Sequence, residues 1–420
     1  RSRRAYAAVS CVVACAADLI HFFSKTITDN NVIARICIFI LLFIVLPDVY
    51  IYARYVRRRT GITLWQRLLW WAPAAILIAY TIALSLIPDF APYELAWLNV
   101  YLFLLGLIAV PKLLFVFCSS VGLLLRRFLH IRRNWGNYVG VVLSLCALYI
   151  LVYGSTTGVD KLHTRRVTLT FDNLPPAFDG YRIVQFSDVH VGSMTHEMMQ
   201  RMVYAINRLK PDAVVFTGDL QNMQPHETDG FSQLLSQIKA KDGVFSVLGN
   251  HDYSVYVEAT EARKRSNEAL LQSRERSYGW QLLMNESRVV RRVADSIVIA
   301  GAENDGRPPF PSRIDMKRMF AGVTDSAFVV VLQHDPSSWR RTILPQSNAM
   351  LTLSGHTHGG QLSIFGFRPT QLTGREDCGI YREGDRVLNV STGVGGFIPF
   401  RFGMPPEVVE LTLRSASKAE

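Results

Sequence analysis

"RIVQFSDVH", residues 182–190, is an apolar run of strand length that ends in an aspartate and a histidine. Four later runs have the same form and end in Asp, Asn or His: "AVVFTGD" ends in Asp219, "VFSVLGNHD" in Asn250, His251 and Asp252, "FVVVLQH" in His334, and "MLTLSGHTH" in His356 and His358. Their apolar parts are rich in Val, Leu, Ile and Phe, which predicts short strands buried on both faces.

Between the early strands, apolar residues recur at helical spacing. In residues 196–210 they include Met198, Met202 and Ile206, and residues 231–241 repeat the pattern. Alternating strands and helices predict a layered α/β domain, and in open α/β sheets ligands bind outside the carboxyl ends of the strands. We therefore expect the polar side chains that follow the strands to meet at one edge of a sheet.

The residue types at these strand ends favour a metal site. A single Asp or Asn after a strand is an ordinary turn residue, but five strand ends that keep supplying His are not explained by turn formation. Carboxylate, amide and imidazole ligands without a thiolate suit Mn, Fe or Zn. Seven candidate ligands exceed the needs of one tetrahedral ion, so we predict two divalent ions that share a bridging carboxylate and can clamp a phosphoryl group.

Two of the strand ends carry candidate ligands two residues apart. Asp188 and His190 have this spacing, and so do His356 and His358. Alternate side chains of an extended segment point the same way, so each pair is expected to converge on one small site. The glycines around His356 and His358 allow a sharp turn and a close approach to a ligand.

Long apolar stretches precede this domain, at residues 36–53, 68–88, 95–118 and 138–154, and a less apolar one covers residues 5–23. Each of the four is long enough to cross a bilayer as a helix, which predicts four or five spans. Asp48 and Lys112 lie within these stretches. Because each follows a proline, a local kink or snorkelling accounts for them without a transport function.

The charge distribution predicts the orientation in the membrane. Residues 1–159 contain 15 Lys/Arg against 5 Asp/Glu, and the rest of the chain is almost balanced. This excess suits membrane topology better than nucleic-acid binding, so no nucleic-acid partner is expected. The basic loops at residues 54–59 and 126–133 should face the cytoplasm, which predicts a multi-pass protein of the inner or plasma membrane with everything after residue 154 on the non-cytoplasmic side. The sequence contains no Cys-x-x-Cys pair, so a structural zinc site is not expected.

The ordered motifs "DVH", "GD", "GNHD", a lone His after a strand and "GHTH" resemble the calcineurin-like metallophosphoesterase superfamily. The similarity covers roughly residues 167–413. The apolar stretches, "SGHTHGGQ" and the late "GVGGFIPFRFGMPPEV" resemble a membrane-anchored branch of that superfamily. The resemblance implies a four-layer α/β sandwich, with two mixed sheets between helices. We accordingly predict a membrane region at 1–156, a linker at 157–166 and the metallophosphoesterase domain at 167–415.

The resemblance also implies a role for each residue. One ion would bind Asp188, His190, Asp219 and His358, and the other would bind Asp219, Asn250, His334 and His356, so that Asp219 is the bridge. His251 would contact the phosphate and protonate the leaving group, and Asp252 would orient His251 through a hydrogen bond. Arg401, in "FIPFRFG", either binds the substrate phosphate through a bidentate fork or is a surface arginine.

The resulting prediction is a membrane-anchored phosphoesterase that hydrolyses a phosphate ester by a metal-bound hydroxide, with lipid-linked esters among the candidate substrates. Relatives in the family cleave monoesters, diesters or pyrophosphates. One alternative is a UDP-2,3-diacylglucosamine-type pyrophosphate hydrolase of lipid A precursor metabolism, which conflicts with the predicted topology because that precursor is expected in the cytoplasm. The alternative from another class is a non-catalytic membrane receptor that retains a phosphate-binding site.

Overall fold

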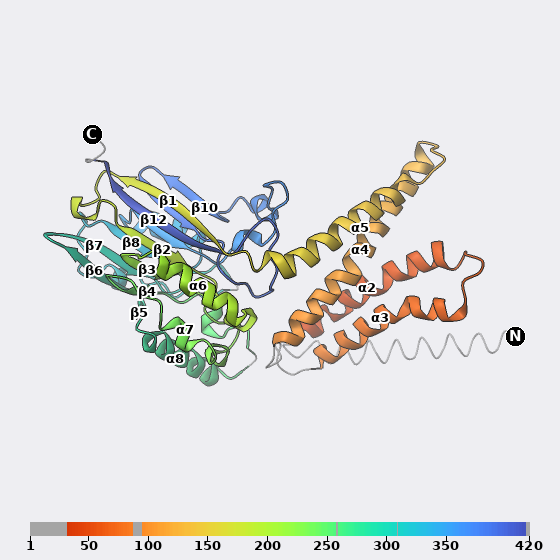
Figure 1. Ribbon diagram of the computed structural model, residues 1–420, viewed down its shortest axis with the longest axis horizontal. Helices are drawn as coiled ribbons and strands as arrows, with labels where there is room; N and C mark the ends of the chain where they lie inside the picture. Colours follow the sequence, from red (N-terminus) through yellow and green to blue (C-terminus); the bar gives the residue numbers. More distant parts are fainter. Residues whose placement is uncertain (1–31, 87–94, 258, 309, 417–420) are drawn as a thin grey trace. The chain divides into compact units, whose positions relative to one another are not determined.

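The computed structural model describes residues 32–86, 95–257, 259–308 and 310–416 (Figure 1). The apolar stretch at 5–23 and the acidic residues Asp89 and Glu94 lie outside the described residues. The chain divides into two compact units, one that ends at Val152 and one that begins at Tyr153.

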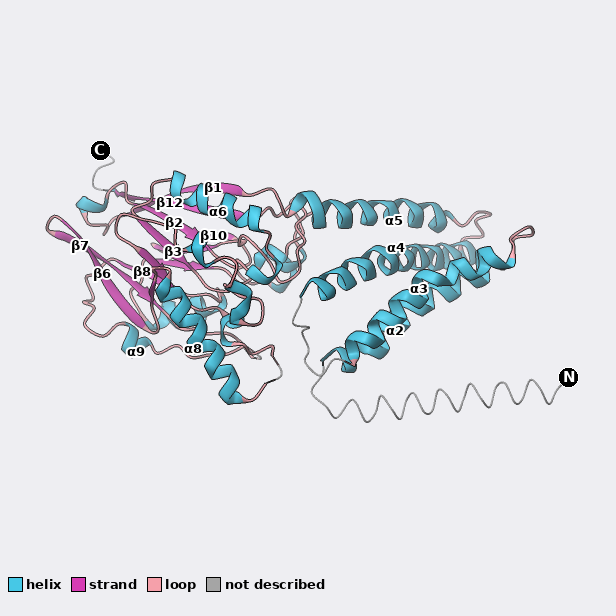
Figure 2. Cartoon of the chain, turned by 60° about the horizontal axis from the view of Figure 1, so that its bottom comes forward, coloured by secondary structure: helices cyan, strands magenta, loops and turns pink. Residues whose placement is uncertain are grey.

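Four long helices occupy the described part of the N-terminal unit (Figure 2): α2 (Val32–Ile51), α3 (Leu64–Ser85), α4 (Leu95–Phe128) and α5 (Trp135–Tyr153). All four are apolar and long enough to cross a membrane, so each of the four predicted stretches forms a long apolar helix that is a candidate span. Helix α4 has 34 residues because it continues beyond the predicted span, through the basic Arg126 and Arg127. Many apolar side chains of these helices are exposed, as lipid-facing residues would be; Phe39 is 72% exposed.

Two charged residues of the spans pair with each other. The Lys112 ammonium lies 2.7 Å from a carboxylate oxygen of Asp48, and Asp48 is fully buried. Each residue directly follows a proline inside its helix, Pro47 in α2 and Pro111 in α4. The pair satisfies both charges inside the helix bundle, which replaces the predicted snorkelling as their explanation.

The second unit contains two mixed six-stranded sheets in the described chain. The first sheet has the order β1 (His163–Phe171), β12 (Glu407–Ser415), β2 (Arg182–Phe186), β3 (Ala213–Phe216), β4 (Val244–Ser246), β5 (Gln281–Leu282). The second has the order β10 (Gly379–Glu383), β11 (Arg386–Val390), β9 (Leu351–Ser354), β8 (Val329–Leu332), β7 (Asp295–Gly301), β6 (Glu286–Arg292). Strands β2 to β5 run parallel, as do β7, β8, β9 and β11.

Helices cover the outer faces of both sheets. The first sheet packs against α6 (His196–Arg208), α7 (Ser232–Leu235) and α8 (Glu261–Ser277), through Met199 and Met202 among others (Figure 1). The second packs against α9 (Met316–Met319), Trp339 and the short α10 (Leu344–Gln346). A third apolar cluster takes residues from both sheets, including Ile183 and Val330, and forms the core between them. The four-layer expectation is confirmed.

Three local expectations differ from the structure. All five predicted strands form, but β2, β3 and β4 lie in the first sheet and β8 and β9 in the second, so their ends do not share one sheet edge. The helix expected over 231–241 is reduced to α7. Strand β1 begins at His163, inside the predicted linker, because it pairs in parallel with β12 over nine residues.

Candidate metal centre

The candidate ligands follow five strands, and the backbone turns sharply where they stand. Asp188, His190, Asp219, His356 and His358 all have φ between 49° and 72°. Residues other than Gly rarely adopt this left-handed backbone conformation, and those that do cluster at functional sites. The prediction that these pairs lie on extended backbone, where alternate side chains point the same way, was therefore wrong. Left-handed loop conformations direct these side chains, not the alternation along a strand.

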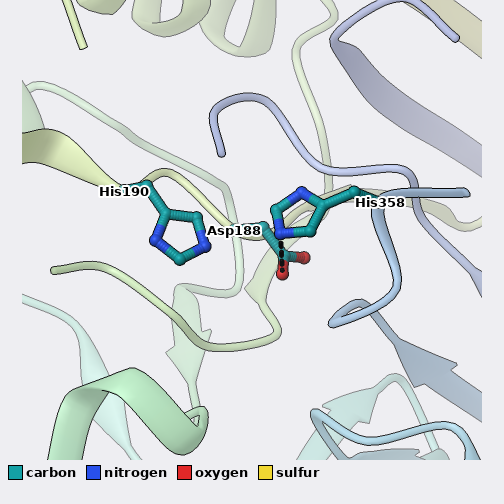
Figure 3. A group of neighbouring side chains, drawn as sticks. All are labelled: Asp188, His190 and His358. Atoms are coloured by element: carbon teal, nitrogen blue, oxygen red, sulfur yellow. Dashed lines mark ion pairs between the residues drawn. The ribbon is translucent and has the colours of Figure 1, made fainter. Parts of the chain in front are cut away.

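These side chains form overlapping clusters. Ligand atoms of Asp188, His190 and His358 lie within 4.8 Å of one another, and so do those of Asp219, His334 and His356. A third group, His190, Asp219 and His251, shares one residue with the first cluster and one with the second. Figure 3 shows His358, whose Nε2 lies 3.5 Å from the Asp188 carboxylate, with His190 beside it. His356 and His358 thus belong to different clusters, although their spacing predicted that they would converge.

Asp219 connects the two clusters. Its Oδ2 lies 3.0 Å from Nε2 of His334 and 3.7 Å from Nε2 of His190, while its Oδ1 accepts the main-chain N–H of His251 at 2.8 Å. Burial disfavours the charged carboxylate, but His334, His251 and His190 together outweigh this effect and hold the pKa of Asp219 well below its ordinary value. This central position is the one that a bridging carboxylate requires.

Close main-chain packing assembles the centre. A Cβ on Gly249 would overlap the Asp219 carboxylate, and one on Gly355 would overlap that of Asp188. The N–H of His356 also donates to both Asp188 oxygens, at 3.0 and 3.1 Å. Glycine is thus required where the loops after β3 and β4 meet, and where the loop after β9 of the second sheet meets the loop after β2.

The donor set fits divalent metal ions. Asn250 donates its amide N–H to the Tyr256 hydroxyl at 2.7 Å, which leaves its buried Oδ1 without a hydrogen-bond partner. Both ring nitrogens of the buried His190 also lack a hydrogen bond. Buried polar atoms are normally paired, so these orphaned atoms point to ligands that complete them. Nitrogen and oxygen donors of this kind suit Mn, Fe or Zn.

Most of the histidines are held in the neutral form that binds metals. Burial lowers the pKa of His190, His356 and His358, helped at His358 by the positive charge of Arg401. His334 differs: burial lowers its pKa, but Asp219, Asp188 and the Thr217 carbonyl together outweigh this effect and raise the pKa of His334 to about 10. Its Nδ1 lies 2.7 Å from the Thr217 carbonyl, so its Nε2 is directed at Asp219.

Asp252 does not orient His251 as the sequence analysis expected. Its buried carboxylate accepts four main-chain N–H groups that belong to Asp219, Leu220, Gln221 and Gly249. The ring of His251 is instead fixed through Nδ1, which lies 2.5 Å from the carbonyl oxygen of Asn222. Asp252 therefore holds together the two loops that carry the ligands, and Asn222 sets the angle of the His251 ring.

Arg401 is buried, with 2% of its surface exposed, so it is not a surface arginine. Its guanidinium contacts the carbonyl oxygens of His358, Gly393 and Gly395, and one nitrogen lies 3.3 Å from Nδ1 of His358. These contacts occupy the fork that was expected to bind phosphate. The geometry fits a residue that directs Nε2 of His358 toward Asp188, because the partner on one ring nitrogen fixes how the other is presented.

Asn222, Thr217 and Tyr256 contact the site residues but were not predicted from the sequence. Asn222 and Thr217 act through main-chain carbonyl groups, which every residue carries, so no side-chain pattern could have identified them. Tyr256 lies six residues after Asn250, and its hydroxyl accepts the Asn250 amide N–H at 2.7 Å. In the sequence, only its position near the "GNHD" motif could have suggested that Tyr256 contacts a candidate ligand.

Two family models match the chain in sequence. Residues 34–159 match "Probable Calcineurin-like phosphoesterase, transmembrane domain", and residues 181–360 match "Calcineurin-like phosphoesterase". The first covers the described spans and the second contains the ligands from Asp188 to His358. The sequence resemblance to this family is thereby confirmed.

Individual relatives agree with these matches. The chain is 30% identical to a transmembrane protein with metallophosphoesterase domain from Danio rerio, over 67% of this chain and 64% of that protein. It therefore spans just under two thirds of that relative's length. It is 31% identical to a metallophosphoesterase of Aquifex aeolicus, over 60% of this chain and 92% of the relative. It is also 29% identical to the UDP-2,3-diacylglucosamine pyrophosphatase LpxG of Chlamydia trachomatis, over 58% of this chain and 87% of LpxG.

Proposed function

The chain belongs to the calcineurin-like metallophosphoesterases that carry a transmembrane domain, and from this we propose that it hydrolyses a phosphate ester at two divalent metal ions. The observation that carries the proposal is the pair of buried ligand clusters on either side of Asp219. A complete set of seven ligands also argues against a non-catalytic receptor.

Two bound ions would supply a hydroxide nucleophile near neutral pH and a positive field for the phosphate oxygens. The residues of the chain would hold these ions. Asp188, His190 and His358 would hold one, His334, His356 and the Asn250 oxygen the other, with Asp219 between them. Their burial restricts access by bulk water and strengthens their interaction with an anionic substrate.

His251 would donate a proton to the leaving oxygen. Because its Nδ1 lies against the Asn222 carbonyl, Nδ1 carries a proton and Nε2 is the nitrogen free to act. Its ring lies 4.7 Å from the ring of His190, measured between centroids, which puts it next to the ligand cluster. A general acid must lie within hydrogen-bonding reach of the leaving group, and this position is compatible with that role.

The test uses the full chain in detergent or nanodiscs, with p-nitrophenyl phosphate and bis-p-nitrophenyl phosphate as substrates. Hydrolysis should depend on added Mn²⁺ and disappear with a chelator. Asp219→Asn should abolish both turnover and stoichiometric metal binding, whereas the exposed Asp172→Asn should preserve both. A folded chain that binds two ions without turnover on any phosphate ester would instead support the receptor function.

The charge pattern supports a location of the phosphoesterase unit on the non-cytoplasmic side. Basic residues gather at 54–59 and at 126–133, and we place both segments in the cytoplasm. A reporter fused after Gly154 tests this placement, because cytoplasmic activity of the reporter would reverse it.

Hydrolysis of a UDP-2,3-diacylglucosamine-type pyrophosphate is the second candidate function. The similarity to LpxG supports it. The proposed topology opposes it, because that substrate is expected on the cytoplasmic side. Direct assay with this substrate, together with the reporter experiment, separates the two. A cytoplasmic phosphoesterase unit that cleaves the pyrophosphate would favour this second function.

A further inference from the structure

A cavity of about 250 Å³ lies next to the metal centre within the second unit. Its wall is mainly apolar, with Met194, Met198, Val394, Ile398 and Phe400 among the lining residues. Helix α6 supplies Met198, and the loop between β11 and β12 supplies Val394, Ile398 and Phe400.

The polar side chains in the wall are largely engaged within the protein. Thr195 accepts the N–H of Met198 at 3.2 Å, Asp160 pairs with Arg201 at 3.0 Å, and Ser193 donates to the Phe397 carbonyl at 2.9 Å. The guanidinium of Arg401 is directed at main-chain carbonyl groups. A polar ligand would lose its hydration here and gain few new partners, so the cavity suits an apolar one.

One side of the cavity is bonded to the metal centre. The lining residue Gly395 donates its N–H to the Asp188 carbonyl at 2.8 Å, and Arg401 lies 3.3 Å from Nδ1 of His358. Ser193 accepts the side-chain N–H of Asn222 at 2.7 Å, and the carbonyl of Asn222 holds His251. The lining is thus bonded directly to Asp188 and His358, which belong to one cluster, and through Asn222 to the proposed acid His251.

Another side is formed by the end of the last candidate span. Ser155 and Val159 line the cavity, and Ser155 belongs to the continuous helix that runs from Trp135 to Gly158. At about 1.5 Å per residue, these 24 residues extend about 36 Å, more than the hydrocarbon core of about 30 Å. The last turn of this helix therefore reaches the membrane interface when the helix spans.

The helix end is packed directly against the loop that carries Arg401. The N–H of Arg401 donates to the Gly154 carbonyl at 2.9 Å. A Cβ on Gly154 would overlap the ring of Phe400, and one on Gly158 would overlap the carbonyl oxygen of Arg401. The cavity is consequently held between a membrane-derived helix end and a loop bonded to a metal ligand.

We propose that this cavity binds the alkyl or acyl chain of a phosphate ester that reaches the metal centre from the membrane. The proposal rests on the proposed phosphoesterase function and adds the substrate class, an amphiphile with an apolar chain near its phosphate. Ile398, which is 41% exposed, forms part of the lip through which such a chain enters.

The test compares decyl p-nitrophenyl phosphate with methyl p-nitrophenyl phosphate on the full chain in phosphatidylcholine nanodiscs. The two diesters share a leaving group, and partition of the decyl ester into the nanodisc is the same for every variant. Ser155→Trp, which fills the cavity, should lower the decyl-to-methyl ratio of kcat/KM about tenfold, the effect of returning roughly two methylene groups to water. Thr157→Trp, on the same helix but outside the cavity and exposed, should leave this ratio unchanged.

A binding measurement makes the result independent of turnover. A decyl phosphate with a mid-chain diazirine should label the peptides that contain Met194, Met198 or Ile398, and Ser155→Trp should reduce this labelling. Equal ratios for wild type and Ser155→Trp, or labelling confined to the spans, would overturn the cavity proposal even if the methyl ester is cleaved. If neither ester is cleaved, the proposed function fails on these substrates, and the labelling alone decides whether the cavity binds the chain.

Discussion

Asp252→Asn separates two explanations of this aspartate. The Oδ2 atom of Asp252 accepts the N–H groups of Asp219 and Gly249, both at 2.8 Å, and Oδ1 accepts those of Leu220 and Gln221 at 2.9 and 3.3 Å. In asparagine an NH₂ group replaces one oxygen, so two buried N–H groups lose their acceptor and face a donor. At about 1–3 kcal/mol for each buried unsatisfied group, the free energy of unfolding should fall by about 2–6 kcal/mol.

The assay measures urea unfolding of the full chain in mild detergent, followed at each urea concentration by brief proteolysis of the unfolded fraction. Burial, and then the Asp219 carboxylate, raise the pKa of Asp252 to about 7, so the comparison is made at pH 8.5, where this side chain is charged. Metal content of the folded fraction is measured in parallel. It should fall, because Asp252 positions the main chain at Asp219 and beside Asn250.

Asp172→Asn is the matched control, because Asp172 is exposed and its substitution should change neither quantity. The opposite result for Asp252→Asn would be unchanged stability and full metal content with a large loss of activity. That outcome would mean that Asp252 acts on His251, as the family resemblance implied, and that its bonds to the four N–H groups do not hold the loops together.

Three further predictions concern the surroundings of the metal centre. Gly158→Ala should lower the free energy of unfolding by about 1–3 kcal/mol and weaken metal retention, because the added Cβ overlaps the Arg401 carbonyl, although Gly→Ala in a helix normally stabilises by about 1 kcal/mol. Gly230→Ala is the control, because an added Cβ there has no neighbour within 4 Å. Equal thermal midpoints for Gly158→Ala and the wild type would contradict this prediction. Burial raises the pKa of Glu227 from 4.5 to about 7, so the folded state binds the carboxyl proton more tightly than the unfolded state does. The stability that protonated Glu227 contributes should therefore be greatest below pH 4.5 and fall by up to about 3 kcal/mol as the pH rises to 7. Urea titrations of Glu227→Gln across this range should lack that fall in the free energy of unfolding. His251→Ala should lower kcat about 10²–10⁴-fold for alkyl phosphates and less for p-nitrophenyl phosphate, whose leaving group needs no proton, and an equal loss for both substrates would exclude the general-acid role.

Local sequence patterns determined which residues follow the strands. Runs of Val, Ile, Leu and Phe predicted β2, β3, β4, β8 and β9, because a short apolar run bounded by turn residues favours a buried strand regardless of its partners. The same patterns identified the four spans, because hydrophobic length is a property of a continuous segment. The order of Asp, Asn and His residues then sufficed to predict a metal site.

The tertiary structure alone decided how those residues are used. His356 and His358 have the spacing that suggests one site, but their left-handed backbone conformations send them to different clusters. Asn222 and Arg401 act through contacts with residues 29 and 43 positions away in sequence. Such contacts depend on how two sheets and their loops pack together. That packing is a non-local property, which periodicity and composition within a segment do not encode.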